Sequence, residues 1–295
     1  MSAATVADRL HDHGIELRHD GAGTQRLPCP ACGRGPRDSA LAITVNPDGT
    51  VVWVCHRCGF KGCARERTES ITKPPSRPLS RRAEPERHER LTEHASALWA
   101  ACVPITSGTV AAKYLEFRGC ALPPVDSELR MHAAVLHWPT QQRFPALVGL
   151  ITDAVTCTPL SLHFTFLKPD GMGKAGTACD KLLLPKHRKS GGVIRLWPDD
   201  TVTDGLGIAE GIETALSVAH AFTPVWGCVD AGNLGSFPVL PGIECLTIFC
   251  DHDESKIGER HAKACAERWY AAGREVFLCT PRAPGDWNDR ARETA

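Results

Sequence analysis

The pattern of apolar and polar positions divides the chain into segments with different predicted structures. Residues 1–63 begin with a short amphipathic stretch and continue into a cysteine-rich segment. Residues 64–90 are rich in Pro, Arg and Glu with very little to bury, so we predict a linker without a core of its own. Helical periodicity and then short apolar runs follow over residues 91–204. The predicted elements there are helices over 91–101 and 109–118, strands over 133–138, 146–151 and 160–167, and a hairpin turn at Asp170 and Gly171.

Residues 205–295 have a different pattern of apolar positions, in which short apolar runs alternate with stretches of helical periodicity. The runs at 207–209, 225–229, 245–250 and 275–279 are predicted strands, and the stretches 212–222 and 258–272 are predicted helices. This alternation is typical of a parallel, doubly wound sheet that is covered on both faces, and the fold class is therefore α/β. Ligands of such sheets bind beyond the carboxyl ends of the strands.

Charge is balanced overall but not along the chain. The 295 residues include 34 Lys and Arg against 34 Asp and Glu. Residues 206–295 hold 8 basic and 13 acidic residues, which leaves 26 basic and 21 acidic residues for the first 205. An excess of five positive charges thus precedes an excess of five negative ones, which suits a polyanion-binding part joined to a cation-binding part.

Fourteen cysteines raise the question of a secreted disulfide scaffold. The first ten residues contain no apolar core of a signal peptide, and no apolar run reaches the length of a membrane span. We therefore expect a cytoplasmic protein with no membrane partner and with reduced thiols, except where cysteines hold metal.

Four cysteines form a metal-binding pattern. Cys29 and Cys32 make one C-x2-C pair, Cys55 and Cys58 make a second, and 22 residues lie between the pairs. That interval accommodates a hairpin over 41–45 and 51–54, so the pattern predicts a zinc ribbon with structural Zn²⁺ on four thiolates. Two further residues, His56 and Cys63, are alternative ligands. The ribbon either touches nucleic acid through residues such as Arg57, Lys61 and Trp53 or is purely structural.

Carboxylates follow two of the predicted strands of the parallel sheet. Glu210 comes directly after the run 207–209, and Asp251 and Asp253 follow the run 245–250. If these strands are close together, the acids converge at one edge, where Mg²⁺ or Mn²⁺ would neutralise them. The alternative for each acid is a helix cap. Further candidates for metal ligands are Glu213, Asp286 and Asp289, and the last two either join the metal site or belong to a segment that caps the sheet.

A basic stretch precedes these acids. Residues 165–195 hold seven Lys or Arg against two Asp, which suits a groove for a phosphate backbone, although a solvated basic face is the alternative. A Walker A motif is absent because Lys168 stands where its first Gly is required. The candidate nucleic-acid or nucleotide contacts are Lys168, Lys174, Lys181, Lys186 and Arg188, with Lys256 and Arg260 as weaker candidates on the helix after the Asp pair.

The order of these acids resembles a known domain. Glu210 and Gly211 before a helix, and then Asp251-x-Asp253 before a Gly-opened helix, resemble the Toprim domain. That domain is shared by bacterial DnaG-type primases, topoisomerases, overcoming-lysogenization-type nucleases and RecR recombination proteins. The order of zinc ribbon, linker, mixed α/β lobe and Toprim domain is similar to that of the primases, including those of phages and mobile elements. Segments 113–119, 144–148, 164–168 and 181–185 resemble the start and the basic lobe of the primase core.

The resemblance implies a domain plan and an activity. It implies a zinc-ribbon domain over 1–63, a linker over 64–90, a basic lobe over 91–204 and a Toprim catalytic domain with a Rossmann-like parallel sheet over 205–295. The activity is that of a DNA primase, a nucleotidyltransferase that makes short RNA primers on single-stranded DNA from NTPs. Glu210, Asp251 and Asp253 would hold Mg²⁺ or Mn²⁺, and a replicative helicase supplied in trans is a candidate partner.

The sequence also departs from the primases and leaves other activities open. The replicative primases usually have a Cys/His/Cys/Cys ribbon and an Asp where this chain has Thr214, so Glu213 is the candidate for that acid. The rival interpretations are a Toprim nuclease and a non-catalytic DNA-binding protein of the RecR kind. A topoisomerase needs a nucleophilic tyrosine, whereas Tyr114 and Tyr270 both lie in helical contexts typical of packing.

Overall fold

The computed structural model describes residues 10–11, 13–19, 21–33, 35, 38–47, 49–64, 88–251, 256–281, 285 and 287–288. The chain divides into two compact units, Met1–Ser80 and Arg81–Ala295. Most of the predicted linker 64–90 lies outside the described residues. Across the described part of the chain, no helix is both long enough and apolar enough to cross a membrane.

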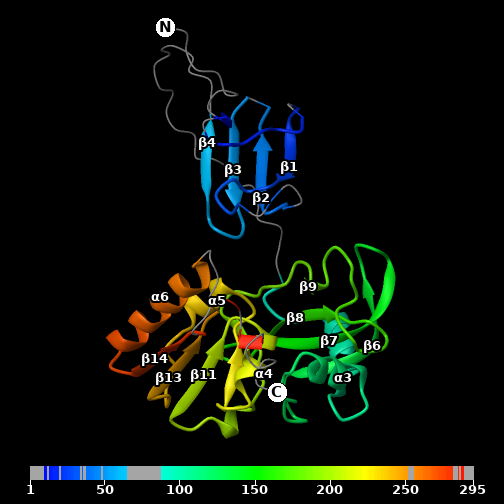
Figure 1. Ribbon diagram of the computed structural model, residues 1–295, viewed down its shortest axis with the longest axis vertical. Helices are drawn as coiled ribbons and strands as arrows, with labels where there is room; N and C mark the ends of the chain where they lie inside the picture. Colours follow the sequence, from blue (N-terminus) through cyan, green and yellow to red (C-terminus); the bar gives the residue numbers. More distant parts are fainter. Residues whose placement is uncertain are drawn as a thin grey trace. The chain divides into compact units, whose positions relative to one another are not determined.

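The first unit is a small antiparallel sheet (Figure 1). Its strands follow one another in the order of the chain: β1 (Gly23–Leu27), β2 (Leu41–Val45), β3 (Val51–Cys55) and β4 (Lys61–Ala64). Strands β2 and β3 pair from Leu41 opposite Cys55 to Val45 opposite Val51, which confirms the predicted hairpin. Alternate residues of both strands are buried, as expected for a sheet with one face on a core. Strands β1 and β4 were not predicted.

The first part of the second unit is built on another antiparallel sheet. It begins with the two predicted helices, α2 (Glu93–Ala100) and α3 (Val110–Phe117). The sheet has the order β5-β6-β7-β8-β9, and β10 pairs with β7. The turn predicted at Gly171 is confirmed, because Gly171 has φ 78° and its N–H bonds to the carbonyl of Lys168 at 3.0 Å. The strands are β5 (Val103–Pro104), β6 (Leu129–His137), β7 (Gln142–Asp153), β8 (Pro159–Phe166), β9 (Lys181–Leu183) and β10 (Gly192–Val193).

The second part is the predicted parallel sheet. A short 3-10 turn (Asp199–Thr201) precedes it. Its four strands have the order β12-β11-β13-β14 and are all parallel. Helix α5 was missed because its six residues include two glycines, which are poor helix formers. The elements are β11 (Gly205–Ala209), α4 (Ile212–Val218), β12 (Val225–Gly227), α5 (Ala231–Ser236), β13 (Cys245–Phe249), α6 (Ile257–Ala271) and β14 (Glu275–Cys279).

Helices cover both faces of this parallel sheet. Adjacent residues of one strand point to opposite faces, and Ile248 and Phe249 of β13 accordingly belong to two different hydrophobic cores. Ile248 packs in the core with Trp269 of α6, on the face that α5 and α6 cover in Figure 1. Phe249 packs in the core with Leu216 of α4. The prediction of a doubly covered sheet is thus confirmed.

The basic lobe and the parallel-sheet part share the second of these cores. Tyr114 of α3 and Leu147 of β7 are buried in the same cluster as Leu216 and Phe249. The backbones also join, because the N–H of Ile194 bonds to the carbonyl of Gly227 at 2.8 Å. The shared core fixes side chains of both parts around one cavity.

Candidate functional site

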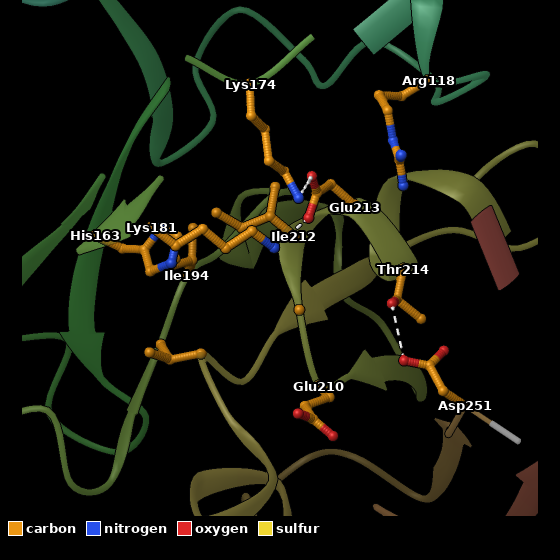
Figure 2. Close-up of a pocket in the computed structure, with 12 residues that line it drawn as sticks. Arg118, His163, Lys174, Lys181, Ile194, Glu210, Ile212, Glu213, Thr214 and Asp251 are labelled. Atoms are coloured by element: carbon orange, nitrogen blue, oxygen red, sulfur yellow. Dashed lines mark hydrogen bonds and ion pairs between the residues drawn. The ribbon is translucent and has the colours of Figure 1, made fainter. Parts of the chain in front are cut away.

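Two of the predicted acids lie side by side at the carboxyl edge of the parallel sheet. Strands β11 and β13 are hydrogen-bonded neighbours, with Ala209 opposite Phe249. Glu210 follows the first of these residues directly, and Asp251 lies two positions after the second. Both side chains are half-buried, and the Thr214 hydroxyl donates to Asp251 Oδ2 at 3.5 Å (Figure 2). The predicted acidic edge required β11 and β13 to be neighbouring strands, and they are. Asp253 lies outside the described residues.

Helix α6 begins close to this edge. A Cβ placed on Gly258, in the first turn of α6, would stand 3.4 Å from Glu210 Oε2. Glu210, at the end of β11, therefore lies beside the N-terminus of α6, whose partial positive charge attracts a carboxylate.

A cavity of about 330 Å³ connects this acidic edge to the basic lobe. The parallel-sheet part contributes acidic and hydroxyl groups, whereas the lobe contributes cations and one imidazole. Carboxylates on one side and cations on the other are suited to a phosphate ester with a bridging divalent metal. The polar side chains that line the cavity are Glu210, Glu213, Thr214 and Asp251 from the first part and Arg118, His163, Lys174 and Lys181 from the lobe.

Glu213 faces the lobe and not the other two acids (Figure 2). Its carboxylate accepts a hydrogen bond from the Tyr114 hydroxyl and forms ion pairs with Lys174 Nζ at 3.1 Å and with Lys181 Nζ. Burial raises the pKa of Glu213, but the charges of Lys181 and Lys174 outweigh it and lower the pKa to about 2. Glu213 was a candidate metal ligand. In the structure its carboxylate instead pairs with two lysines and points away from Glu210 and Asp251.

The other predicted basic residues are not gathered at the cavity. Arg188 is held by Asp153 at 2.7 Å and by Glu89 at 3.0 Å. Arg195, counted in the basic stretch, is 5% exposed and bonds to Asp199 and to backbone carbonyls, so it has a structural role. The exposed candidates outside the cavity lining are Lys168, Lys186, Lys256 and Arg260.

Arg118 lines the cavity but was not among the residues chosen from the sequence. It is the C-cap residue of α3 and is half-buried. Figure 2 shows its guanidinium directed towards Thr214. The signal was available, because Arg118 belongs to the 113–119 segment that resembles the primase core.

Two segments of the second unit match known protein families. Residues 205–295 match the family model described as Toprim domain, and residues 89–196 match the one described as Domain of unknown function (DUF7146). The chain contains a Toprim domain. No curated protein matches the chain. Toprim domains bind Mg²⁺ in general, and the domain indicates a metal-dependent role in nucleic-acid processing, as in primases, nucleases or recombination proteins.

Trp287 and Asn288, the described residues of the segment 286–289, cap the sheet of the Toprim domain. Trp287 Nε1 donates to the carbonyl of Cys250 at 3.2 Å, and the Trp287 ring packs against Phe249. Asn288 is 1% exposed, and its amide donates to Ser217 Oγ at 2.9 Å and to the carbonyl of Arg118. The described residues of this segment therefore follow the capping interpretation. Asp286 and Asp289 lie outside the described residues.

The four cysteines of the first unit come together as predicted. The Sγ atoms of Cys29, Cys32, Cys55 and Cys58 lie within 4.8 Å of one another. The pairs Cys29–Cys58 and Cys32–Cys55 are each 3.7 Å apart. Zn–S bonds of about 2.3 Å in a tetrahedron require sulfur atoms about 3.8 Å apart, so the cluster fits zinc. His56 and Cys63 are exposed and do not belong to the cluster that the described residues form.

Hydrogen bonds around Cys55 favour its ionised form, whereas burial raises the pKa of Cys29 and raises that of Cys32 to about 12. Burial raises the pKa of Cys55, but the backbone N–H groups of Cys58 and Arg57 donate to its sulfur and bring the pKa to about 7. Asp38 accepts from Arg57 Nη1 at 2.9 Å and from the backbone N–H of Cys29 at 3.4 Å. It thereby connects the two cysteine turns. Such outer contacts orient metal ligands.

Trp53 does not fit the nucleic-acid contact considered for it. The side chain is 4% exposed and packs among the core residues of the first unit. A Cβ on Gly62 would lie 2.3 Å from its ring, so the neighbouring strand is in close contact with it. Trp53 therefore stabilises the sheet, and stacking on bases would need another residue.

Proposed function

We propose that the protein is a DNA primase, which synthesises short RNA primers on a single-stranded DNA template by metal-dependent nucleotidyl transfer from NTPs. The observation that carries the proposal is a single cavity that is lined both by Glu210 and Asp251 and by three cations of the lobe, Arg118, Lys174 and Lys181. A nuclease needs metals and one phosphodiester at its site. A polymerising site must in addition hold a triphosphate beside the metals, and the cationic side of the cavity suits that group.

Glu210 and Asp251, with Asp253 as the third acid, are the proposed ligands of Mg²⁺ or Mn²⁺. Their hard oxygen donors at one sheet edge match the ligands that these ions prefer. A bound ion would neutralise negative charge on the reacting phosphate. Arg118, Lys174 and Lys181 then orient the nucleotide by its phosphates, and Thr214 holds the Asp251 carboxylate through its hydrogen bond.

The template would be held outside this cavity. The exposed Lys168, Lys186, Lys256 and Arg260 are the proposed backbone contacts, because such contacts supply affinity without sequence choice. In the proposal the zinc site is structural and shapes the N-terminal unit for the template. A replicative helicase supplied in trans would bring the protein to its DNA.

The test is primer synthesis in vitro. The full chain is incubated with single-stranded DNA, labelled NTPs and Mg²⁺ or Mn²⁺, and the products are separated on a denaturing gel. We expect short oligoribonucleotides that require both template and metal. Cleavage of the template without synthesis would assign the site to a Toprim nuclease.

A binding assay separates the remaining alternative. A non-catalytic protein of the RecR kind predicts that Asp251→Ala leaves DNA binding unchanged and that the wild type incorporates no nucleotide. The proposed primase also predicts nearly unchanged DNA binding for that variant, but with synthesis by the wild type and its loss in the variant.

A further inference from the structure

We propose that Glu213 is a positioning residue that holds Lys174 and Lys181 in place to bind the polyphosphate of a nucleoside triphosphate. The choice of nucleotide rests on the proposed function. The arrangement of the lysines rests on contacts within the second unit alone.

Lys174 and Lys181 keep hydrogen-bond donors that Glu213 does not use. An ammonium group has three N–H donors, and each of these two lysines directs one towards the Glu213 carboxylate. The side chains of Lys174 and Lys181 remain 32% and 42% exposed, and both line the cavity. Donors therefore remain on both lysines for a ligand inside the cavity.

Glu213 is itself held in place by its surroundings. Its side chain is 11% exposed. Its carboxylate accepts from the hydroxyl of Tyr114, which is fully buried in the shared core. A buried carboxylate with an immobile neutral donor on one side is a rigid support for two long and otherwise flexible side chains.

The backbones of Lys174 and Lys181 are fixed as well. Lys181 is the first residue of β9, and Lys174 bridges to Leu167 at the end of the same hairpin. The turn between Leu167 and Lys174 contains Gly171, where a Cβ would meet Val110 O at 2.9 Å and Lys113 Cβ at 2.8 Å. The hairpin is thus packed tightly on α3. Lysines that are already ordered lose less conformational freedom when a ligand binds.

The balance of charge supports an anionic ligand. On the lobe side of the cavity, three cations (Lys174, Lys181 and Arg118) outnumber the one carboxylate of Glu213, while the carboxylates of Glu210 and Asp251 belong to the acidic edge. His163 adds no charge at neutral pH, because burial and the nearby Lys181 lower its pKa to about 4. Glu213 thus orders two cations without cancelling them.

The competing explanation is that these ion pairs only tie the lobe to the Toprim domain. The two explanations differ for Glu213→Gln, which keeps the shape of the side chain and removes its charge. Electrostatics alone predicts that this variant binds an anion more tightly, since a negative charge has been lost. A positioning role predicts weaker binding, because the two lysines are no longer held.

The experiment measures binding of inorganic tripolyphosphate to the full-length protein by calorimetry, without divalent metal and without template. We expect Lys174→Met and Lys181→Met each to weaken binding about 10-fold, in line with the loss of one charge-assisted contact. Glu213→Gln should weaken it about 5-fold or more. The matched control is Lys263→Met, an exposed lysine of α6 that pairs with Glu259 away from the cavity, and it should change binding less than about 2-fold.

Binding by Glu213→Gln that equals or exceeds that of the wild type would overturn the inference, as would a wild type that does not bind tripolyphosphate. A second comparison guards against a folding defect in Glu213→Gln. Lys181→Met should cost about 10-fold in the wild-type background and less than about 3-fold in the Glu213→Gln background, because the lysine is already displaced there. Equal costs in the two backgrounds would also contradict a positioning role.

The binding experiment can fail or succeed independently of the test for primer synthesis. Tripolyphosphate binding needs no synthesis, so the inference stands if the binding pattern holds while no primers are made. Primer synthesis together with unchanged binding by Glu213→Gln would refute the inference alone.

Discussion

The two candidate metal sites of this chain differ in how their ligands are brought together and in how open they are. The cysteine site takes all four ligands from two short turns, and its sulfur atoms already lie within 4.8 Å of one another. The acidic site takes Glu210 and Asp251 from neighbouring strands and opens into a cavity of about 330 Å³. A closed ligand set suits a structural ion, whereas an open one leaves positions for substrate and water. The difference predicts that loss of a ligand affects stability at the first site and chemistry at the second.

The largest effect is expected for Cys55→Ser. Structural zinc contributes roughly 10 kcal/mol or more to the folding of small zinc domains, so this variant should lose its zinc and unfold the N-terminal unit. Zinc content per chain, measured by elemental analysis, should fall from about one to near zero. The matched control is Cys63→Ser, an exposed cysteine outside the cluster, which should keep its zinc. A Cys55→Ser protein with full zinc content would refute the four-cysteine site.

The second effect concerns Asp251→Asn. Primer synthesis should fall by about 10²–10³-fold, because the amide is a poor ligand and transition-state charge stabilisation is lost. Its melting temperature without metal should stay within about 3 °C of the wild type, since removing one of two neighbouring negative charges relieves repulsion. Calorimetry with and without Mg²⁺ should show metal-dependent stabilisation in the wild type only. Glu267→Gln, an exposed carboxylate of α6, is the control and should behave as the wild type.

The third effect is a pH dependence that arises at Glu213. Its folded-state pKa of about 2 lies below the usual value of 4.5, so its stabilising effect is complete above pH 4.5 and is lost as the pH falls towards 2. The full loss amounts to about 3 kcal/mol by linkage, of which about 2 kcal/mol is lost by pH 3. Urea unfolding at pH 6 and pH 3 should show a smaller pH effect in Glu213→Gln than in the wild type. An identical pH effect in both proteins would mean that the lysine contacts do not persist in solution.

The smallest effect is expected for Asp38→Asn. The amide still accepts from Arg57 and Cys29 but no longer carries the charge that orders the two cysteine turns. Loss of such an outer contact typically costs about 10-fold in metal affinity. Competition with a chromophoric chelator measures this change, and the variant should still fold in excess zinc. Loss of all zinc in Asp38→Asn would place this residue among the ligands.

The parts of the fold that sequence patterns predicted are those set by nearby residues. The two cysteines of each pair are separated by only two residues, and the hairpin between the pairs was predicted from the length of that interval. The parallel sheet followed from alternating apolar runs, and the position of Glu210 and Asp251 followed from the rule that strand ends share an edge. These inferences needed no knowledge of distant contacts.

The parts that escaped prediction depend on residues far apart in the chain. Glu213 was grouped with the acids because it lies three residues from Glu210, but its partners Tyr114, Lys174 and Lys181 come from the basic lobe. Arg195 looked like one more surface cation until its burial was known. Tertiary packing decides such roles. The primase activity, the catalytic roles of the acids and the nucleic-acid contacts stay predictions until they are measured.

The core shared by the lobe and the Toprim domain limits how the two segments can be exchanged between genes. Family models match residues 89–196 and 205–295 separately, yet Tyr114 and Leu147 of the first segment are buried with Leu216 and Phe249 of the second. Recombination between the two segments would divide one apolar core, and each half would need a partner of complementary shape. We therefore expect related genes to carry the two segments as a pair, exchanged together or not at all.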